Sequence, residues 1–185
     1  LELIRGEVQT VGAGEAFEFP APEGGFIALA YPLQDTKIRG KGIPLQGAVK
    51  NGIVKGVAPT AGAETQQWQI WSFGVKRHEG TLNSMLKHAG QTVVDGYFQE
   101  FENNNNGTSD GLNFFFNDEL EVGLKKFAWN HDFADEFQTR KGYSLFDYLP
   151  AMWTDMGDIT PKVKIDYADV RMSLIEERYF EPIYN

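Results

Sequence analysis

The pattern of the chain changes near Thr65, and this change constrains the fold more than any other feature. Residues 1–65 are rich in Gly, Pro, Ala and Val, and their short apolar runs are separated by Gly and Pro. Glu15–Phe19 alternates polar and apolar residues, which is typical of a half-buried strand. We therefore expect residues 1–65 to form a β-rich flanking or inserted segment. It serves either as a small structural subdomain or as a carbohydrate-binding surface.

After Thr65, strand-like and helix-like patterns alternate. Trp68–Phe73 has the composition of a strand, and apolar residues recur at helical spacing in Leu82–Phe101. Gly111–Gly123 predicts a second strand. Three helices should follow, at Asn130–Lys141, Leu145–Met152 and Asp166–Tyr184. This order indicates an α/β fold with a parallel sheet.

The number of predicted βα units is small for a closed barrel. A complete (β/α)₈ barrel needs roughly 250 residues, and the region after Thr65 supplies only two or three units. We therefore expect residues 66–185 to be part of a (β/α)₈, TIM-type catalytic domain. The chain would then be a fragment of a larger protein, and it would contact the remainder of the barrel or associate with itself.

Helix-end signals are clear in the second half of the chain. Asn130 can cap the helix that ends at Lys141, and Gly142 follows that helix directly. A glycine at this position commonly adopts a left-handed conformation. Ser144 should cap the next short helix, and Asp166 should cap the last one.

Composition excludes several classes of function. The formal net charge is −9, which disfavours nucleic acid and anionic membrane surfaces as partners. The absence of cysteine rules out disulfides and thiolate chemistry. His78, His88 and His131 do not have the spacing of a zinc site, so no metal site or cofactor is predicted from the residues.

The stretch Gly111–Gly123 carries the strongest candidate chemistry. Its apolar run ends in Asn117, Asp118, Glu119 and Glu121. Active-site groups of parallel sheets lie at the carboxyl ends of strands. A glutamate there, backed by phenylalanines, would be partly desolvated, which raises its pKa and suits a general acid. Asn117, Asp118 and Glu121 would then contribute to substrate binding.

A structural explanation of the same residues remains open. Acidic residues after a strand also solvate loops or cap helices. Trp129 is a candidate for stacking on a sugar ring, although tryptophan is equally common in protein cores. The alternative to an enzyme is therefore a non-catalytic carbohydrate-binding or structural protein.

The region from Trp68 to the end of the chain resembles bacterial glycoside hydrolases of the α-L-rhamnosidase type. The resemblance is carried by Phe114–Glu119, by Trp129 with the helix Phe133–Phe137, and by the run Arg140–Pro150. It implies a (β/α)₈ catalytic barrel, a carbohydrate substrate and Glu119 as a catalytic carboxylate. Such enzymes often have a small residue after the glutamate, where this chain has Leu120.

The resemblance also has implications for cofactors and for the cellular localisation. It allows a calcium ion, whose ligands the sequence does not identify. It is compatible with a periplasmic or secreted bacterial protein, although the sequence alone leaves the localisation open. A second catalytic carboxylate would come from a later strand. The sugar, the linkage and the stereochemical outcome depend on that group, because the separation of the two carboxylates sets the mechanism.

Overall fold

A computed structural model describes residues 1–60, 66–80, 82–108, 110–111 and 127–184 of the chain. Its first part is built from strands: β1 (Glu2–Gly12), β2 (Ala16–Pro20), β3 (Gly25–Gln34), β4 (Lys37–Ile38), β5 (Ile43–Pro44), β6 (Val49–Lys50), β7 (Ile53–Val57) and β8 (Gln67–Lys76). The strands predicted around Glu15–Phe19 and Trp68–Phe73 are confirmed as β2 and β8.

The second part is mainly helical. It contains α1 (Ala89–Val93), the π-helical turn η1 (Val94–Phe98), α2 (Gln99–Asn104), the short strand β9 (Phe127–Ala128) and α3 (Phe133–Lys141). Two 3₁₀ turns follow, η2 (Leu145–Asp147) and η3 (Leu149–Met152), and then α4 (Ile159–Ile175), the π-helical turn η4 (Glu176–Phe180) and α5 (Glu181–Tyr184).

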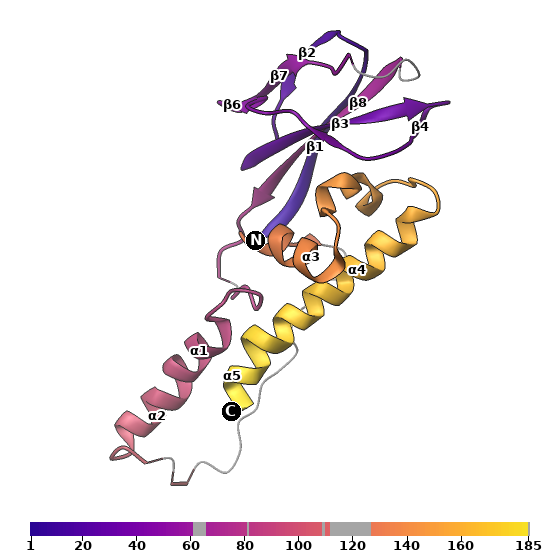
Figure 1. The fold of residues 1–185 in the computed structure, drawn as a ribbon. Coiled ribbons are helices and arrows are strands. Elements are labelled where there is room, and N and C mark those ends of the chain that lie inside the picture. The colour runs from indigo at the N-terminus through magenta and orange to yellow at the C-terminus, as the bar shows by residue number, and fades with distance from the viewer. Residues whose placement is uncertain (61–65, 81, 109, 112–126, 185) are drawn as a thin grey trace.

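The strands form two antiparallel sheets. The larger has the order β4-β3-β8-β1-β9, with β5 also paired to β3, and the smaller has the order β2-β7-β6. β8 lies at the centre of the larger sheet, where it pairs with β1 on one side and β3 on the other. Together the strands make a curled half-barrel, from which the helices extend (Figure 1).

The prediction of a partial (β/α)₈ barrel is wrong. Every strand pair in the described residues is antiparallel, including the pair between β9 and β1. The alternation of strand and helix patterns suggested crossover connections. In the structure, however, β8 pairs back to strands near the start of the chain. Paired residues of β1 and β8 lie 55 to 74 positions apart, as in Gly12 with Gln67 and Glu2 with Lys76, and no local sequence pattern indicates such a pairing.

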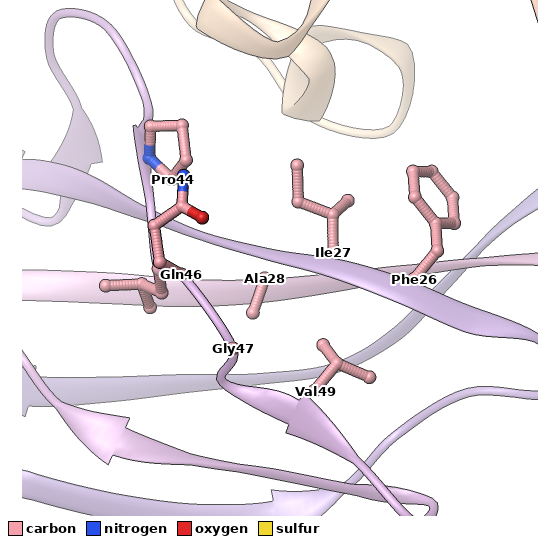
Figure 2. Close-up of a pocket in the computed structure, with 8 residues that line it drawn as sticks. Phe26, Ile27, Ala28, Pro44, Gln46, Gly47 and Val49 are labelled. Atoms are coloured by element: carbon pink, nitrogen blue, oxygen red, sulfur yellow. The ribbon is translucent and has the colours of Figure 1, made fainter.

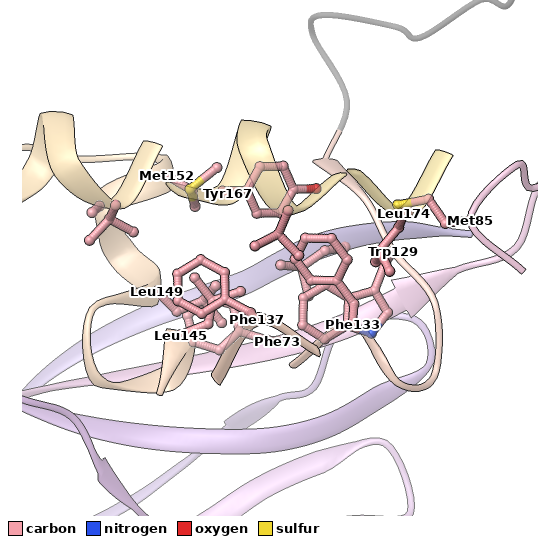
Figure 3. Close-up of a cluster of buried hydrophobic side chains, with 14 of the residues drawn as sticks. Phe73, Met85, Trp129, Phe133, Phe137, Leu145, Leu149, Met152, Tyr167 and Leu174 are labelled. Atoms are coloured by element: carbon pink, nitrogen blue, oxygen red, sulfur yellow. The ribbon is translucent and has the colours of Figure 1, made fainter. Parts of the chain in front are cut away.

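Two apolar clusters lie on opposite faces of the larger sheet. Trp68 and Ile70 of β8 pack with β2 and β7, whereas Trp71 and Phe73 of the same strand face the helices. Figure 3 shows this second cluster, in which Phe73 lies beside side chains of α3, η3 and α4. Phe73, Phe133, Phe137, Leu149 and Leu174 are fully buried there.

The helices extend from this cluster as an arm, to whose inner side α1 and η4 contribute Ala89, Val93 and Tyr179. In the arm, α1 runs alongside η4 and α5, and α2 continues α1 beyond them (Figure 1). The backbones approach closely at Gly90, where an added Cβ would lie 2.4 Å from the carbonyl oxygen of Tyr179. Only glycine therefore fits this crossing. None of the helices described is both long and apolar enough to cross a membrane.

The predicted helix ends have mixed outcomes. Gly142 adopts the left-handed conformation after α3, with φ 75°, and Ser144 Oγ accepts a hydrogen bond from the Phe146 amide, so both predictions are confirmed. The predicted starts at Leu82 and Asp166 are wrong, because the helices begin at Ala89 and Ile159. Asp166 lies inside α4, where its side chain accepts a hydrogen bond from the Tyr143 hydroxyl group.

Candidate functional site

The predicted acidic cluster lies outside the described residues. Asn117, Asp118, Glu119 and Glu121 fall within residues 112–126. The role of Glu119 as a general acid, and of the other three in substrate binding, therefore stays a prediction. The structure does describe the chain from Phe127 onward, directly after that cluster.

Trp129 follows β9 and lies in the apolar cluster next to the helices. Its side chain is 5 % exposed, and its ring packs near Phe133, Phe146 and Phe26, with centroid distances of 5.2, 6.4 and 6.2 Å. Stacking on a sugar requires an open ring face, and this ring is largely covered by protein. The sugar contact predicted for Trp129 stays untested, but its visible role is to anchor the residues that follow.

Those residues line a pocket of about 450 Å³. One wall is the turn Asn130–Asp132, and the other is the segment that leads into α1. The lining combines apolar and polar side chains: Leu82, Leu86, Lys87, His88, Ala89, Thr92, Asn130, His131 and Asp132. Pockets of this size, apolar on one side with a few convergent polar groups, are typical of small-molecule sites.

Hydrogen bonds to the main chain hold the two walls together. The carbonyl oxygen of Met85 accepts from Asn130 Nδ2 at 2.7 Å and from Arg178 Nη1 at 2.8 Å. Asn83 Nδ2 donates to the carbonyl oxygen of Trp129 at 2.7 Å. These hydrogen bonds join the segment before α1, the Asn130–Asp132 turn and the π-helical turn η4 at one point of the pocket wall.

Arg178 also fixes the one carboxylate that lines the pocket. Its two terminal nitrogens lie 3.0 and 3.1 Å from the two oxygens of Asp132, and Nη2 donates to Glu136 Oε1 at 2.7 Å. Lys87 Nζ lies 3.6 Å from Asp132 Oδ2. Partial burial opposes ionisation of Asp132, but the hydrogen bonds from Arg178 and the two positive charges outweigh it. The pKa of Asp132 therefore lies below its usual value, and the group is a carboxylate at neutral pH.

A second hollow, of about 210 Å³, lies on the strands (Figure 2). It is lined by Phe26, Ile27, Ala28, Pro44, Leu45, Gln46, Gly47 and Val49. These eight residues include no titratable side chain, and their only polar side chain is Gln46. This hollow therefore lacks the groups that acid–base chemistry or an ionic ligand would need.

The described part of the chain contains no group of three or more His, Asp or Glu side chains that could hold a metal ion. The calcium ion implied by the resemblance stays a prediction. Comparisons with protein-family models, curated proteins and solved structures found no match for this chain. The function of the candidate site is therefore inferred from the geometry of its residues.

Only part of this pocket could be predicted from the sequence. Asn130 was expected to cap α3, but the helix begins at Phe133, and the buried Asn130 side chain bonds Met85 instead. Local patterns gave no indication of Asp132 or Arg178 as site residues. Their pairing joins positions 46 residues apart in the chain. One signal in the sequence was the run of polar residues Asn130–Asp132 directly after Trp129, which a simple helix start does not require.

Proposed function

We propose that this chain is a glycoside hydrolase, or a portion of one, that uses Glu119 as general acid and holds a sugar ring in the pocket beside Asn130–Asp132. The observation that carries the proposal is the composition of this pocket. Leu82 and Leu86 offer an apolar surface to the face of a sugar ring, while Asp132 offers carboxylate oxygens to its hydroxyl groups.

The position of the pocket in the chain supports the same proposal. The stretch that carries Glu119 leads directly into β9, which is fixed at the edge of the larger sheet by pairing with β1. Tyr167 secures β9 further by donating a hydrogen bond to the carbonyl oxygen of Ala128. The pocket begins two residues after this anchor. The residues that line the pocket thus follow closely in the sequence after the acidic residues that include Glu119.

The proposed role of Glu119 follows from the chemistry of glycosidic bonds. The leaving oxygen of a natural glycoside is a poor leaving group unless it is protonated as the bond breaks. A general acid contributes roughly 10²–10⁴-fold to such a step. Aryl glycosides with an activated phenolic leaving group need little protonation. The two substrate classes therefore respond differently when the acid is removed.

The test compares Glu119→Gln with the unmodified protein, using both this chain and the longest natural gene product that contains it. We expect turnover of natural glycosides to fall at least 100-fold, with sugar binding retained and activated aryl glycosides largely spared. Asp135→Asn, which changes an exposed carboxylate on α3, is the matched control. If Glu119→Gln leaves natural turnover within a few-fold of the unmodified protein, Glu119 is not the acid.

A non-catalytic carbohydrate-binding protein is the second candidate, and the same pocket favours it. In that case sugars bind, but no preparation hydrolyses a glycoside, and Glu119→Gln changes nothing. Measuring binding and turnover on the same panel of glycosides separates the two functions.

A further inference from the structure

The pocket beside the Asn130–Asp132 turn differs in charge from the chain as a whole. The chain has 26 acidic and 17 basic residues and a formal net charge of −9. The described residues that line the pocket, by contrast, include a single carboxylate, Asp132, and three basic side chains, those of Lys87, His88 and His131. Two of the three histidines of the chain therefore lie at this one place. A local excess of basic groups on an acidic protein favours an anionic group of a ligand there.

The charge of Asp132 is met mainly from behind the pocket. Arg178, whose side chain is 10 % exposed, places its two terminal nitrogens 3.0 and 3.1 Å from the two oxygens of Asp132. The same guanidinium group bonds Glu136, which also receives a hydrogen bond from Arg140. Asp132 is thus held by Arg178 in two hydrogen bonds, and Lys87 is not needed to position it.

Lys87 is the cation that a ligand can reach. Its side chain is 69 % exposed, and Nζ lies 3.6 Å from Asp132 Oδ2, which is longer than a hydrogen bond. No hydrogen bond to this ammonium group occurs among the described residues. Because Asp132 itself lines the pocket, the contact between the two charges places the ammonium group at the pocket rim. An ammonium group has three N–H donors, so it can bind a ligand carboxylate while it stays beside Asp132.

We infer that the pocket binds an acidic sugar, a uronic acid unit, and that Lys87 is the specificity-determining residue that binds its carboxylate. The inference rests on the proposed function for the ligand being a sugar, and it adds the class of sugar. The exposed side chains of His88 and His131 can supply further N–H donors to the same carboxylate. The hydroxyl groups of the ring would donate to Asp132. A neutral sugar lacks the group that Lys87 binds, so charge, rather than any hydroxyl group, separates the two classes.

The experiment compares matched pairs of ligands that differ only in a carboxylate. Binding of the methyl glycosides of glucuronic and galacturonic acid, of methyl glucoside and methyl galactoside, and of acetate to the whole chain is measured by NMR or calorimetry. We expect at least one uronide to bind about ten-fold tighter than its neutral counterpart at low ionic strength, as a charge-assisted hydrogen bond implies. This advantage should shrink as salt is added. Acetate should bind more weakly than the uronide, because it has no ring to cover Leu82 and Leu86.

The same ligands are measured on variants of Lys87. Lys87→Gln removes the charge, and the advantage of the uronide should vanish, whereas Lys87→Arg keeps the charge and should keep most of it. Lys164→Gln, which removes an exposed lysine of α4 outside the pocket, is the matched control and should keep the full advantage. Because Lys87 is 69 % exposed, its substitution should leave the fold intact. The coupling between residue and carboxylate is the quantity that decides.

Four results overturn the inference: no uronide binds, the neutral glycosides bind at least as tightly as the uronides, the advantage of the uronide survives in Lys87→Gln, or acetate binds as tightly as the uronide. The last result would mean a site for any small anion. Failure of the inference is distinct from failure of the proposed enzyme. A uronide preference that depends on Lys87, without any hydrolysis, supports the inference and removes the hydrolase. Hydrolysis of neutral glycosides that depends on Glu119, without a uronide preference, does the reverse.

Discussion

The apolar cluster between the larger sheet and the helices is stabilised in a different way from the arm that carries the pocket. The cluster is held by fully buried side chains such as Phe73 and Phe133. The arm leaves Leu82, Leu86 and Tyr97 at least 40 % exposed and is tied together by Arg178. Burial of apolar surface supplies most of the stability of a fold without fixing directions, whereas the hydrogen bonds of Arg178 fix the geometry of one surface.

The largest loss of stability should come from removing a buried side chain from the apolar cluster. Phe133 is fully buried and packs near Trp129 and Tyr167. Phe133→Ala removes a ring and leaves a cavity, so we expect a loss of about 3–5 kcal/mol in the free energy of unfolding. Ile165→Ala, at a side chain of α4 that is 67 % exposed, should change it by less than about 0.5 kcal/mol. Urea unfolding of both variants measures the contrast, and equal losses would contradict it.

Removing Arg178 should have the next largest effect. Arg178→Ala leaves Asp132 and Glu136 without their main partner, and it frees the Met85 carbonyl oxygen. Breaking a buried pair costs about 3–5 kcal/mol. We expect about 2–3 kcal/mol here, because the two acidic side chains are 28 % and 26 % exposed and can be rehydrated.

Arg140 is the control for this prediction. Arg140 also bonds two carboxylates, Glu136, which it shares with Arg178, and Glu177. Its own side chain is 28 % exposed, against 10 % for Arg178, and Glu177 is 43 % exposed. Arg140→Ala should cost less than about 1 kcal/mol. Sugar binding should be weakened in Arg178→Ala and kept in Arg140→Ala. Equal losses of unfolding free energy for the two variants would mean that the bonds of Arg178 contribute no more than those of a surface ion pair.

A smaller effect is expected at the end of α3. Gly142 has φ 75°, and an added Cβ there would meet nothing within 4 Å. Gly142→Ala should therefore cost only the strain of the left-handed conformation, about 1 kcal/mol. The melting temperature measures this change. An unchanged value would show that α3 ends in another conformation.

The smallest effect is a pH dependence in the arm. Hydrogen bonds from Arg140 lower the pKa of Glu177 despite some burial, so its folded value lies below its unfolded one. A depressed pKa adds stability that is fully present above the unfolded value and is lost as the pH falls through the folded value. Stability should therefore fall as the pH drops below the ordinary titration range of a glutamate, and less steeply in Arg140→Ala. Parallel curves for the two proteins would contradict this contribution.

Local features of the fold could be predicted from the sequence, because their causes are local. The alternation in Glu15–Phe19 correctly predicted a strand, and the glycine after Lys141 correctly predicted a left-handed helix end. The sheet was not predictable in this way. Its antiparallel order depends on β8 returning to β1, as in the pairing of Val11 with Trp68. The short runs around both residues fit parallel and antiparallel partners equally well.

The candidate site shows the same limit. Residue types suggested that carboxylates and amides near Trp129 could act on a sugar. They did not reveal that Asn130 bonds the Met85 carbonyl oxygen, or that Arg178 reaches Asp132 from a π-helical turn. Such groups are brought together by the crossing of α1 and η4, which depends on the space left by Gly90. The prediction for Glu119 rests on the sequence alone.

The central claim is that sugars bind between the segment leading into α1 and the Asn130–Asp132 turn. Amide hydrogen exchange with and without the glycoside that binds best in the panel measured for the proposed function tests it most directly. We expect slower exchange in residues 86–92 and 131–136, with little change in β2, β6 and β7. Protection confined to those strands, or no protection anywhere at a saturating sugar concentration, would contradict it.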